Sequence, residues 1–476
     1  MLKPFTFAVL LFITASSLAQ TATGSKNSAK LDTGVILPNI AVTNRAGQNY
    51  ALYLPSQYTP EKRWPIVYAF DPAARGTAPA ELMKQAAEQY GYIIAASNNS
   101  RNGPMKASAE AAQAVWADTH ARLSIDEKRV YFAGFSGGAR VASYLAQSCK
   151  CVHGVFLSGA GFSPEAPPSP GAVFAVFLTA GLTDFNYGEI TQVNLQLEQL
   201  GFPHFLQRFD GSHEWAPADV WPEAFAWADL LAMKDKRRPR DDAFIAAELD
   251  HFTAQAQKAE QSGNLYFVAG TYRQTVATFD GLTSVEVLAA HAAALEKNPV
   301  IVAARKREKS DFELQASLES DILKLTGGLR DQTDRRIESQ QQTTGAITQL
   351  RQRAEHEKDT EKRRVLERAR FGVFVAMMET GSPLIDSKDL PLARIYLELA
   401  IAARPESSWP HVSLARCLAK MGDKKGALQS LKHATEAGLT AQELANLPTT
   451  APEFAALASD PGFQKLCEAA VSATKP

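Results

Sequence analysis

Residues 129–143 read RVYFAGFSGGARVAS, and this stretch decides the fold. Its first five residues, RVYFA, are of strand length and apolar after Arg129. The motif GFSGG (134–138) follows at once, and small residues continue as a helical pattern. A strand that bends through G-x-S-x-G into a helix places the central residue on a tight, strained turn, because only small neighbours let the helix pack so close to the strand. The stretch therefore predicts a strand, a sharp turn that carries Ser136, and a helix.

Around this stretch, from 34 to 232, short β runs alternate with helical segments. The run PIVYAF (65–70) is apolar without a two-residue alternation, which is typical of a strand covered on both faces. Two early runs, 35–42 and 50–54, flank turn residues and predict an antiparallel hairpin at one edge. Together these patterns predict an α/β fold with a mostly parallel sheet and helices on both faces.

The composition changes at the basic run KDKRRPR (234–240), beyond which the pattern is almost entirely helical. Cations suit a helix C-terminus and proline breaks a helix, so we interpret the run as a helix end followed by a linker rather than as a nucleic-acid patch. The formal net charge of −1 likewise gives no sign of a nucleic-acid or anionic-membrane partner. We expect an α/β domain at 34–233, a linker at 234–241 and a helical region at 242–385.

The last part of the chain, 386–476, carries a repeated pattern. Ala393 and Ala427 lie 34 residues apart, which is the length of a tetratricopeptide repeat. Small and apolar residues occupy the positions where such a repeat needs them: Leu397, Ala400, Pro405, Leu414, Ala415, Leu418, Gly422, Leu431 and Ala434. Stacked repeats usually present a groove to a partner. We therefore predict tetratricopeptide-like repeats here, with an ordinary amphipathic helical hairpin as the alternative.

The first 19 residues have the three-part pattern of a cleaved signal peptide. Lys3 supplies a positive charge, 5–15 is almost entirely apolar, and SSLA (16–19) offers small residues for cleavage before Gln20. The apolar run is about half the length that spans a bilayer, so we prefer a cleaved signal to a membrane anchor. The small polar residues of 20–33 predict a flexible leader. We expect an exported chain, periplasmic or secreted, with no integral membrane segment after cleavage.

Four cysteines are too few for a disulfide-built scaffold. Cys149 and Cys151 are separated by one residue, the wrong spacing for a zinc site or a redox pair, so we interpret them as buried thiols. Cys417 and Cys467 lie in predicted helices that could pack together, and we hypothesise a disulfide between them in an oxidising compartment.

A serine hydroxyl is a weak nucleophile at neutral pH and needs a base that is oriented by a third group. Two loops after later strands supply such groups, one ending in Asp184 and the other containing His213. The carboxyl ends of parallel strands meet at one edge of a sheet, so Ser136, Asp184 and His213 are expected to converge there. His204 lies within a strand and Glu189 within a helix, which makes both weaker candidates.

An oxyanion at a reacting carbonyl needs hydrogen-bond donors, usually two backbone amides. The amide of Gly137, next to the serine, is the first expected donor. Because Pro72 has no N–H, we choose Ala73 over Asp71 as the second.

Aromatic side chains near these loops are candidates to line a substrate pocket. Trp215, Tyr187 and the loop 98–103 are the ones that the chain order places nearest. Aromatic residues are equally common in cores, so packing in the interior is the alternative for Trp215 and Tyr187.

Residues 34–232 resemble the α/β-hydrolase superfamily, near the esterase branch that includes feruloyl esterases, polyhydroxybutyrate depolymerases and dienelactone-hydrolase-like proteins. The resemblance is carried by PIV (65–67), GFSGG (134–138), GLTD (181–184) and GSHEW (211–215). The chain departs from many relatives by having Asp71-Pro72 where they carry His-Gly, and from dienelactone hydrolases by a serine where they use cysteine. The resemblance implies ester hydrolysis through an acyl-enzyme, with no cofactor and no metal.

We therefore expect an exported serine hydrolase, with Ser136 as nucleophile and an ester-bearing small molecule or polymer fragment as substrate. The repeat tail is expected to engage a protein partner, although a tail that covers the site is also consistent with the sequence. Two other functions stay open: a serine peptidase, and an exported repeat scaffold whose hydrolase domain is vestigial.

Overall fold

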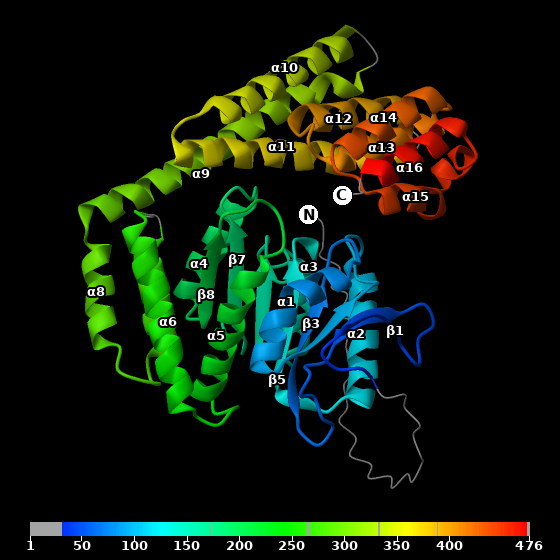
Figure 1. The fold of residues 1–476 in the computed structure, drawn as a ribbon. Helices are drawn as coiled ribbons and strands as arrows, with labels where there is room; N and C mark the ends of the chain where they lie inside the picture. Colours follow the sequence, from blue (N-terminus) through cyan, green and yellow to red (C-terminus); the bar gives the residue numbers. More distant parts are fainter. Residues whose placement is uncertain (1–30, 172, 264–266, 332–333, 388, 474–476) are drawn as a thin grey trace, which may run out of the picture. The chain divides into compact units, whose positions relative to one another are not determined.

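The computed structural model describes residues 31–171, 173–263, 267–331, 334–387 and 389–473 (Figure 1). The signal peptide expected at 1–19 and most of the leader expected at 20–33 lie outside the described residues. Residues Thr33–Pro476 belong to one unit, which contains the sheet and the helical region.

An eight-stranded sheet has the order β1-β2-β4-β3-β5-β6-β7-β8. The first three strands in this order pair antiparallel, and every pair from β4 and β3 onward is parallel. This confirms the mostly parallel α/β class and the antiparallel edge. The strands are β1 (Ile36–Ala41), β2 (Asn49–Tyr53), β3 (Trp64–Phe70), β4 (Ile93–Ser97), β5 (Ile125–Phe135), β6 (Gly154–Ser158), β7 (Ala175–Gly181) and β8 (His204–Phe209).

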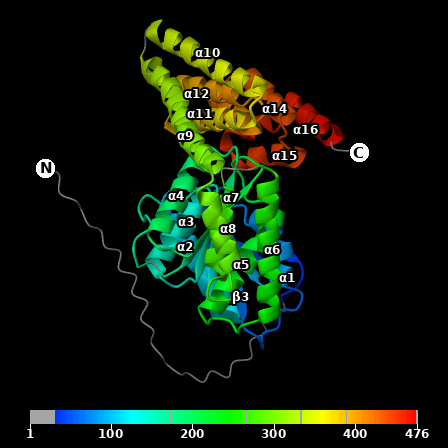
Figure 2. The ribbon, with the colours of Figure 1, turned by 90° about the vertical axis from the view of Figure 1, so that its left-hand side faces the viewer.

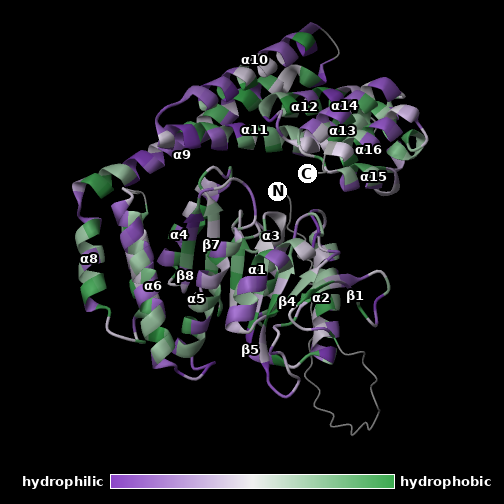
Figure 3. Ribbon diagram, in the orientation of Figure 1, coloured by the Kyte–Doolittle hydropathy of each residue, from purple (hydrophilic) through white to green (hydrophobic). Residues whose placement is uncertain are grey.

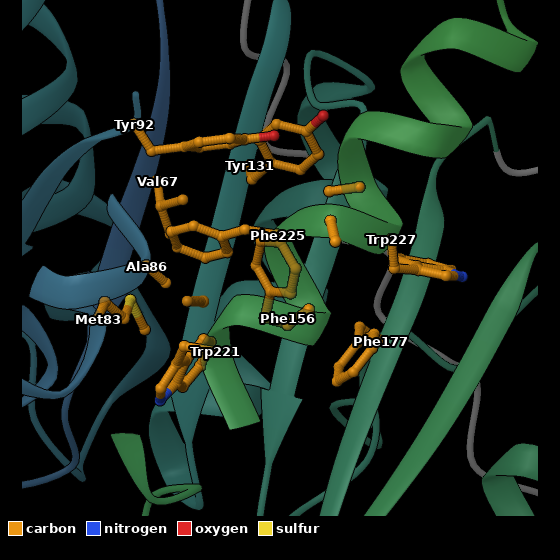
Figure 4. Close-up of a cluster of buried hydrophobic side chains, with 14 of the residues drawn as sticks. Val67, Met83, Ala86, Tyr92, Tyr131, Phe156, Phe177, Trp221, Phe225 and Trp227 are labelled. Atoms are coloured by element: carbon orange, nitrogen blue, oxygen red, sulfur yellow. The ribbon is translucent and has the colours of Figure 1, made fainter. Parts of the chain in front are cut away.

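Helices cover both faces of this sheet. They are α1 (Thr77–Tyr90), α2 (Met105–Arg122), α3 (Gly137–Cys149), α4 (Tyr187–Gln199) and α5 (Trp221–Lys234), with a 3₁₀ turn η1 at Ala218–Val220. Alternate residues of each strand point to opposite faces. On one face Val67, Phe156 and Phe177 pack against α1 and α5 (Figure 4), and on the other Tyr68 stacks on Trp116 of α2. Because both faces are buried, the central strands are apolar throughout, as the run at 65–70 predicts.

Packing of the sheet domain continues past the basic run. Phe252 of α6 (Asp242–Gln261) is 1% exposed and lies edge-on to Phe205 of β8, 5.6 Å between ring centroids. Phe279 of α7 (Val268–Phe279) belongs to the same apolar cluster. Within the run itself, Arg238 pairs with the buried carboxylate of Asp229 on α5. The stretch expected to be a linker is therefore anchored to the sheet domain, and the first helices after it complete the core.

The remaining helices pack around a second apolar core, except that the first of them packs with α6 and α7 in a smaller apolar cluster. They are α8 (Glu286–Glu296), α9 (Pro299–Leu325), α10 (Asp334–His356), α11 (Thr360–Ser387), α12 (Leu390–Ala403), α13 (Ser408–Lys420), α14 (Lys424–Glu436), α15 (Ala441–Thr450) and α16 (Pro461–Ala473), with 3₁₀ turns η2 (Thr326–Arg330) and η3 (Pro452–Leu457). Helices α10 and α11 lie side by side in both views (Figures 1 and 2). Polar residues dominate α10 (Figure 3).

The small residues of the repeated pattern lie at the helix contacts. Ala393 and Ala400 of α12 and Ala427 and Ala434 of α14 are all 0% exposed. A side chain larger than a methyl group at these positions would push neighbouring helices apart, which is why the pattern requires alanine there. Helix pairing is thus present where the sequence predicts it.

The cysteines differ from both sequence-based expectations. Cys149 and Cys151 are joined in a disulfide rather than held as buried thiols. Cys417 and Cys467, expected to pair, are free. Cys417 is fully buried, and its thiol donates to the carbonyl oxygen of Leu390 in α12 at 3.4 Å.

Among the described residues, no single helix has the length and apolar composition of a membrane span. One pair bent by 65°, Glu286–Glu296 with Pro299–Arg330, meets that test only when its two helices are taken together.

Candidate active site

Ser136 occupies the bend between β5 and α3, with φ 53° and ψ −120°. This is a strained conformation for any residue other than glycine, and it turns the hydroxyl out of the sheet. The surrounding glycines make the bend possible. A Cβ on Gly134 would lie 2.0 Å from the carbonyl oxygen of Gly138, and a Cβ on Gly138 would lie 1.9 Å from that of Phe70. The GFSGG motif therefore forms the strand–turn–helix that the sequence predicts.

The structure brings Ser136, His213 and Asp184 together. His213 Nε2 lies 2.9 Å from Ser136 Oγ, and His213 Nδ1 lies 2.9 and 3.0 Å from the two carboxylate oxygens of Asp184. A carboxylate can only accept, so Nδ1–H donates to Asp184 and Nε2 accepts from the serine hydroxyl. This tautomer is the one in which the imidazole can take the proton of Ser136.

Asp184 is fully buried, and this burial raises the pKa of its carboxyl group. Its hydrogen bond with His213 acts in the opposite direction, lowering that pKa by favouring the charged form. The backbone N–H of Asn186 donates to the same carboxylate at 2.8 Å. Two donors, the imidazole and the Asn186 amide, therefore hold the carboxylate beside His213.

The loop that carries Asp184 is tied to the loop that carries His213. The N–H of Thr183 donates to the carbonyl oxygen of Gly211 at 2.9 Å. Gly181 permits this approach, since a Cβ there would lie 2.2 Å from the carbonyl oxygen of Ser212. The glycine in GLTD thus has a steric role, because it lets the acid and histidine loops touch.

The weaker candidates are engaged elsewhere. His204 Nδ1 bonds the carbonyl oxygen of Phe202 at 2.8 Å. Glu189 forms a bidentate pair with Arg140, at 3.0 and 2.9 Å, which links α4 to the helix that follows Ser136.

The amide of Ala73 is already used. It donates to Asp71 Oδ1 at 2.8 Å, and Asp71 is a fully buried carboxylate that also accepts from Trp215 Nε1 and from Arg75. The amides of Ala74, Arg75 and Gly76 also have partners, at Asp71 O, Asp71 Oδ1 and Asn98 Oδ1. The expectation that Ala73 offers a free second donor beside Gly137 is therefore not met. No sequence pattern indicates this, because it depends on how the Asp71 carboxylate turns.

Both aromatic candidates for the pocket lie in the interior. Trp215 is 7% exposed and its indole N–H is bonded to Asp71 Oδ2 at 2.9 Å. Tyr187 is 1% exposed, and its hydroxyl donates to Glu308 Oε1 at 2.8 Å. The alternative of interior packing is thus the correct one. From the loop 98–103, the side chain of Asn102 reaches the site, with its Oδ1 1.8 Å from where a Cβ on Gly137 would lie.

Two phenylalanines that the sequence analysis missed lie against the imidazole of His213. The ring of Phe185 is 4.5 Å from the imidazole and that of Phe371 is 5.8 Å from it, centroid to centroid. Phe185 directly follows Asp184 in the chain, so its position next to the acid could have predicted a place in the site. Phe371 belongs to α11, so no local pattern connects it to the site.

No group of three or more metal-ligating side chains is found among the described residues. Two cavities, of about 640 and 190 Å³, lie at the basic run and beside Glu198, and none of Ser136, Asp184 and His213 lines either one.

No protein-family model matches the chain, and no curated protein matches it. Among solved structures, an esterase from the archaeon Pyrobaculum calidifontis is similar over 42% of this chain and 87% of its own, with 13% identity and a TM-score of 0.35. An S-formylglutathione hydrolase from Staphylococcus aureus is similar over 41% and 95%, with 15% identity and a TM-score of 0.32. An esterase from Mycobacterium marinum is similar over 41% and 82%, with 20% identity and a TM-score of 0.34. At these identities and TM-scores, the likeness carries no activity over to this chain.

Proposed function

We propose that this chain is an exported serine hydrolase that cleaves carboxylic esters through an acyl-enzyme on Ser136. The observation that carries the proposal is the continuous hydrogen-bond series from Ser136 Oγ through His213 to Asp184, with distances of 2.9 to 3.0 Å. The strained backbone at Ser136 adds to it, because such strain is kept where a surrounding structure and a function require it.

In the proposed reaction, Ser136 Oγ attacks the ester carbonyl while His213 Nε2 takes the hydroxyl proton. The tetrahedral oxyanion forms beside the amide of Gly137, and His213 then gives the proton to the leaving alcohol oxygen. Water attacks the acyl-enzyme with His213 again as base, which releases the carboxylic acid and restores Ser136. Asp184 stays ionised and stabilises the imidazolium in both steps.

A fluorophosphonate probe tests this proposal, because it reacts only with an activated serine. We expect one labelled site, Ser136, and loss of labelling in Ser136→Ala and in His213→Ala. Nitrophenyl esters and peptide amides of matched acyl groups then separate an esterase from a peptidase. Equal labelling of the wild type and Ser136→Ala would refute the nucleophile, and cleavage of the amides alone would make the protein a peptidase.

For the tail, we propose tetratricopeptide-type repeats at 386–476 that engage a protein partner. Support comes from the period of 34 between Ala393 and Ala427 and from their complete burial between paired helices. Export is proposed from the pattern of the first 19 residues. Mass spectrometry of the protein from a periplasmic or culture fraction should find Gln20 as its first residue, whereas an intact Met1 in that fraction would contradict cleavage.

A further inference from the structure

The loop that carries Asp184 is held by the helical region as well as by the sheet domain. Arg368 of α11 is 4% exposed, and its Nη1 donates to the carbonyl oxygen of Leu182 at 3.1 Å. Its Nε donates to Gln315 Oε1 at 3.1 Å, and its guanidinium lies 4.7 Å from the ring centre of Tyr187. A buried guanidinium with fixed partners is a rigid fork, so it defines where the Leu182 carbonyl can lie.

A second bond comes from another helix. Gln315 of α9 donates through Nε2 to the carbonyl oxygen of Phe185 at 3.0 Å. Leu182 and Phe185 stand on either side of Asp184 in the chain. The backbone on both sides of the acid is therefore held by α9 and α11, and Arg368 bonded to Gln315 joins the two anchors into one network.

Helix α11 also places an aromatic ring against the imidazole of His213. Phe371 lies one turn after Arg368 on α11, and its ring stands edge-on to His213 at 88°. It also packs on Phe185 at 5.4 Å between centroids, while the guanidinium of Arg404 covers its other side at 4.1 Å. Apolar rings around an imidazole exclude water, and a dry site strengthens the attraction between a carboxylate and an imidazolium.

We propose that the helical region completes the active site, with Arg368 and Gln315 as positioning residues for Asp184 and with Phe371 as a wall against His213. This inference rests on the proposed function. It makes α9 and α11, whose three named residues precede the repeat segment 386–476, part of the catalytic unit. A triad group displaced by about 1 Å can cost a hundredfold in rate, so the anchors matter even though none touches substrate.

The experiment uses the full-length protein and compares Arg368→Ala and Arg368→Lys with the control Arg370→Ala. Arg370 lies on the same helix and pairs with Glu367 and Glu406, neither of which belongs to the acid loop. Active sites are counted with a fluorophosphonate, and kcat per titrated site and KM are measured on a nitrophenyl ester. A structural role alone would lower the number of active sites and leave kcat per site unchanged.

We expect Arg368→Ala to lower kcat per site about tenfold to a hundredfold with KM nearly constant, because acid placement and not binding is lost. Arg368→Lys should recover part of this, since an ammonium can still reach the Leu182 carbonyl but not Gln315 as well. Arg370→Ala should stay within twofold of wild type. Wild-type kcat in Arg368→Ala would overturn the inference while leaving the proposed function intact.

Should Arg368→Ala not fold, Gln315→Leu provides the second test, since it removes the donor to the Phe185 carbonyl and keeps a similar volume. A lower kcat per site in this variant supports the inference, and wild-type kcat overturns it. A wild type that no fluorophosphonate labels would instead refute the proposed function itself.

Discussion

Glu223 of α5 makes the stability of this protein dependent on pH. Its side chain is buried, and this burial, with the nearby charge of Glu248 as a smaller cause, raises the pKa of its carboxyl group from 4.5 to about 7. Below pH 4.5 the folded and unfolded chains both hold the proton. Between pH 4.5 and 7 the unfolded chain releases it and the folded chain keeps it, so the free energy of unfolding falls as the pH rises.

The size of the effect follows from the two pKa values. One pH unit corresponds to about 1.4 kcal/mol, so the gap between 4.5 and about 7 amounts to roughly 3 kcal/mol. Glu223→Gln removes the titration and should therefore gain that amount relative to wild type between pH 4.5 and pH 8. Urea unfolding followed by tryptophan fluorescence at several pH values measures it, with the exposed Glu81→Gln as control. A difference between Glu223→Gln and wild type that stays constant over this range would refute the reasoning.

Three further predictions concern the site, the core and the cysteines. Asp184→Asn should keep the fold but lower kcat by about 10⁴, because an amide favours the wrong tautomer of His213; steady-state ester hydrolysis measures this, and a loss under tenfold would contradict it. Phe252→Ala should lower the free energy of unfolding by about 3–5 kcal/mol, because the ring is buried against the sheet domain; urea unfolding measures this, and a loss below 1 kcal/mol would show that α6 is not part of that core. A thiol titration of unreduced, denatured protein should find two thiols per chain, from the two free cysteines. Four thiols would show that the disulfide between Cys149 and Cys151 does not form.

The part of the site that the sequence predicted is the part that depends on local pattern. Small residues around Ser136 favour a tight bend after a strand, and parallel strands bring their carboxyl ends to one edge. These two facts predict which serine, acid and histidine meet, and the structure places their atoms 2.9 to 3.0 Å apart. The same patterns predicted the α/β class, which the strand order confirms.

The remainder depends on contacts that no local pattern encodes. Arg368 reads as one more cation in a charged helical stretch, and only the docking of α11 turns it toward the Leu182 carbonyl. The amide of Ala73 is not a free donor because the carboxylate of Asp71 is oriented to accept from it. The pairing of the cysteines was predicted from their spacing and from the compartment. Neither of these indicates which Cβ atoms lie close enough for a disulfide.

The held acid loop also has a consequence for how the protein is made. Phe371 lies 158 residues after His213, so a ribosome exposes the whole triad well before α11 exists. At about 5–20 residues per second, the delay is roughly 10 to 30 s. Because Asp184 is positioned by α9 and α11 in the proposed site, Ser136 of a nascent chain would react slowly during that interval. The order of synthesis would then delay full hydrolytic activity until α9 and α11 have docked on the sheet domain.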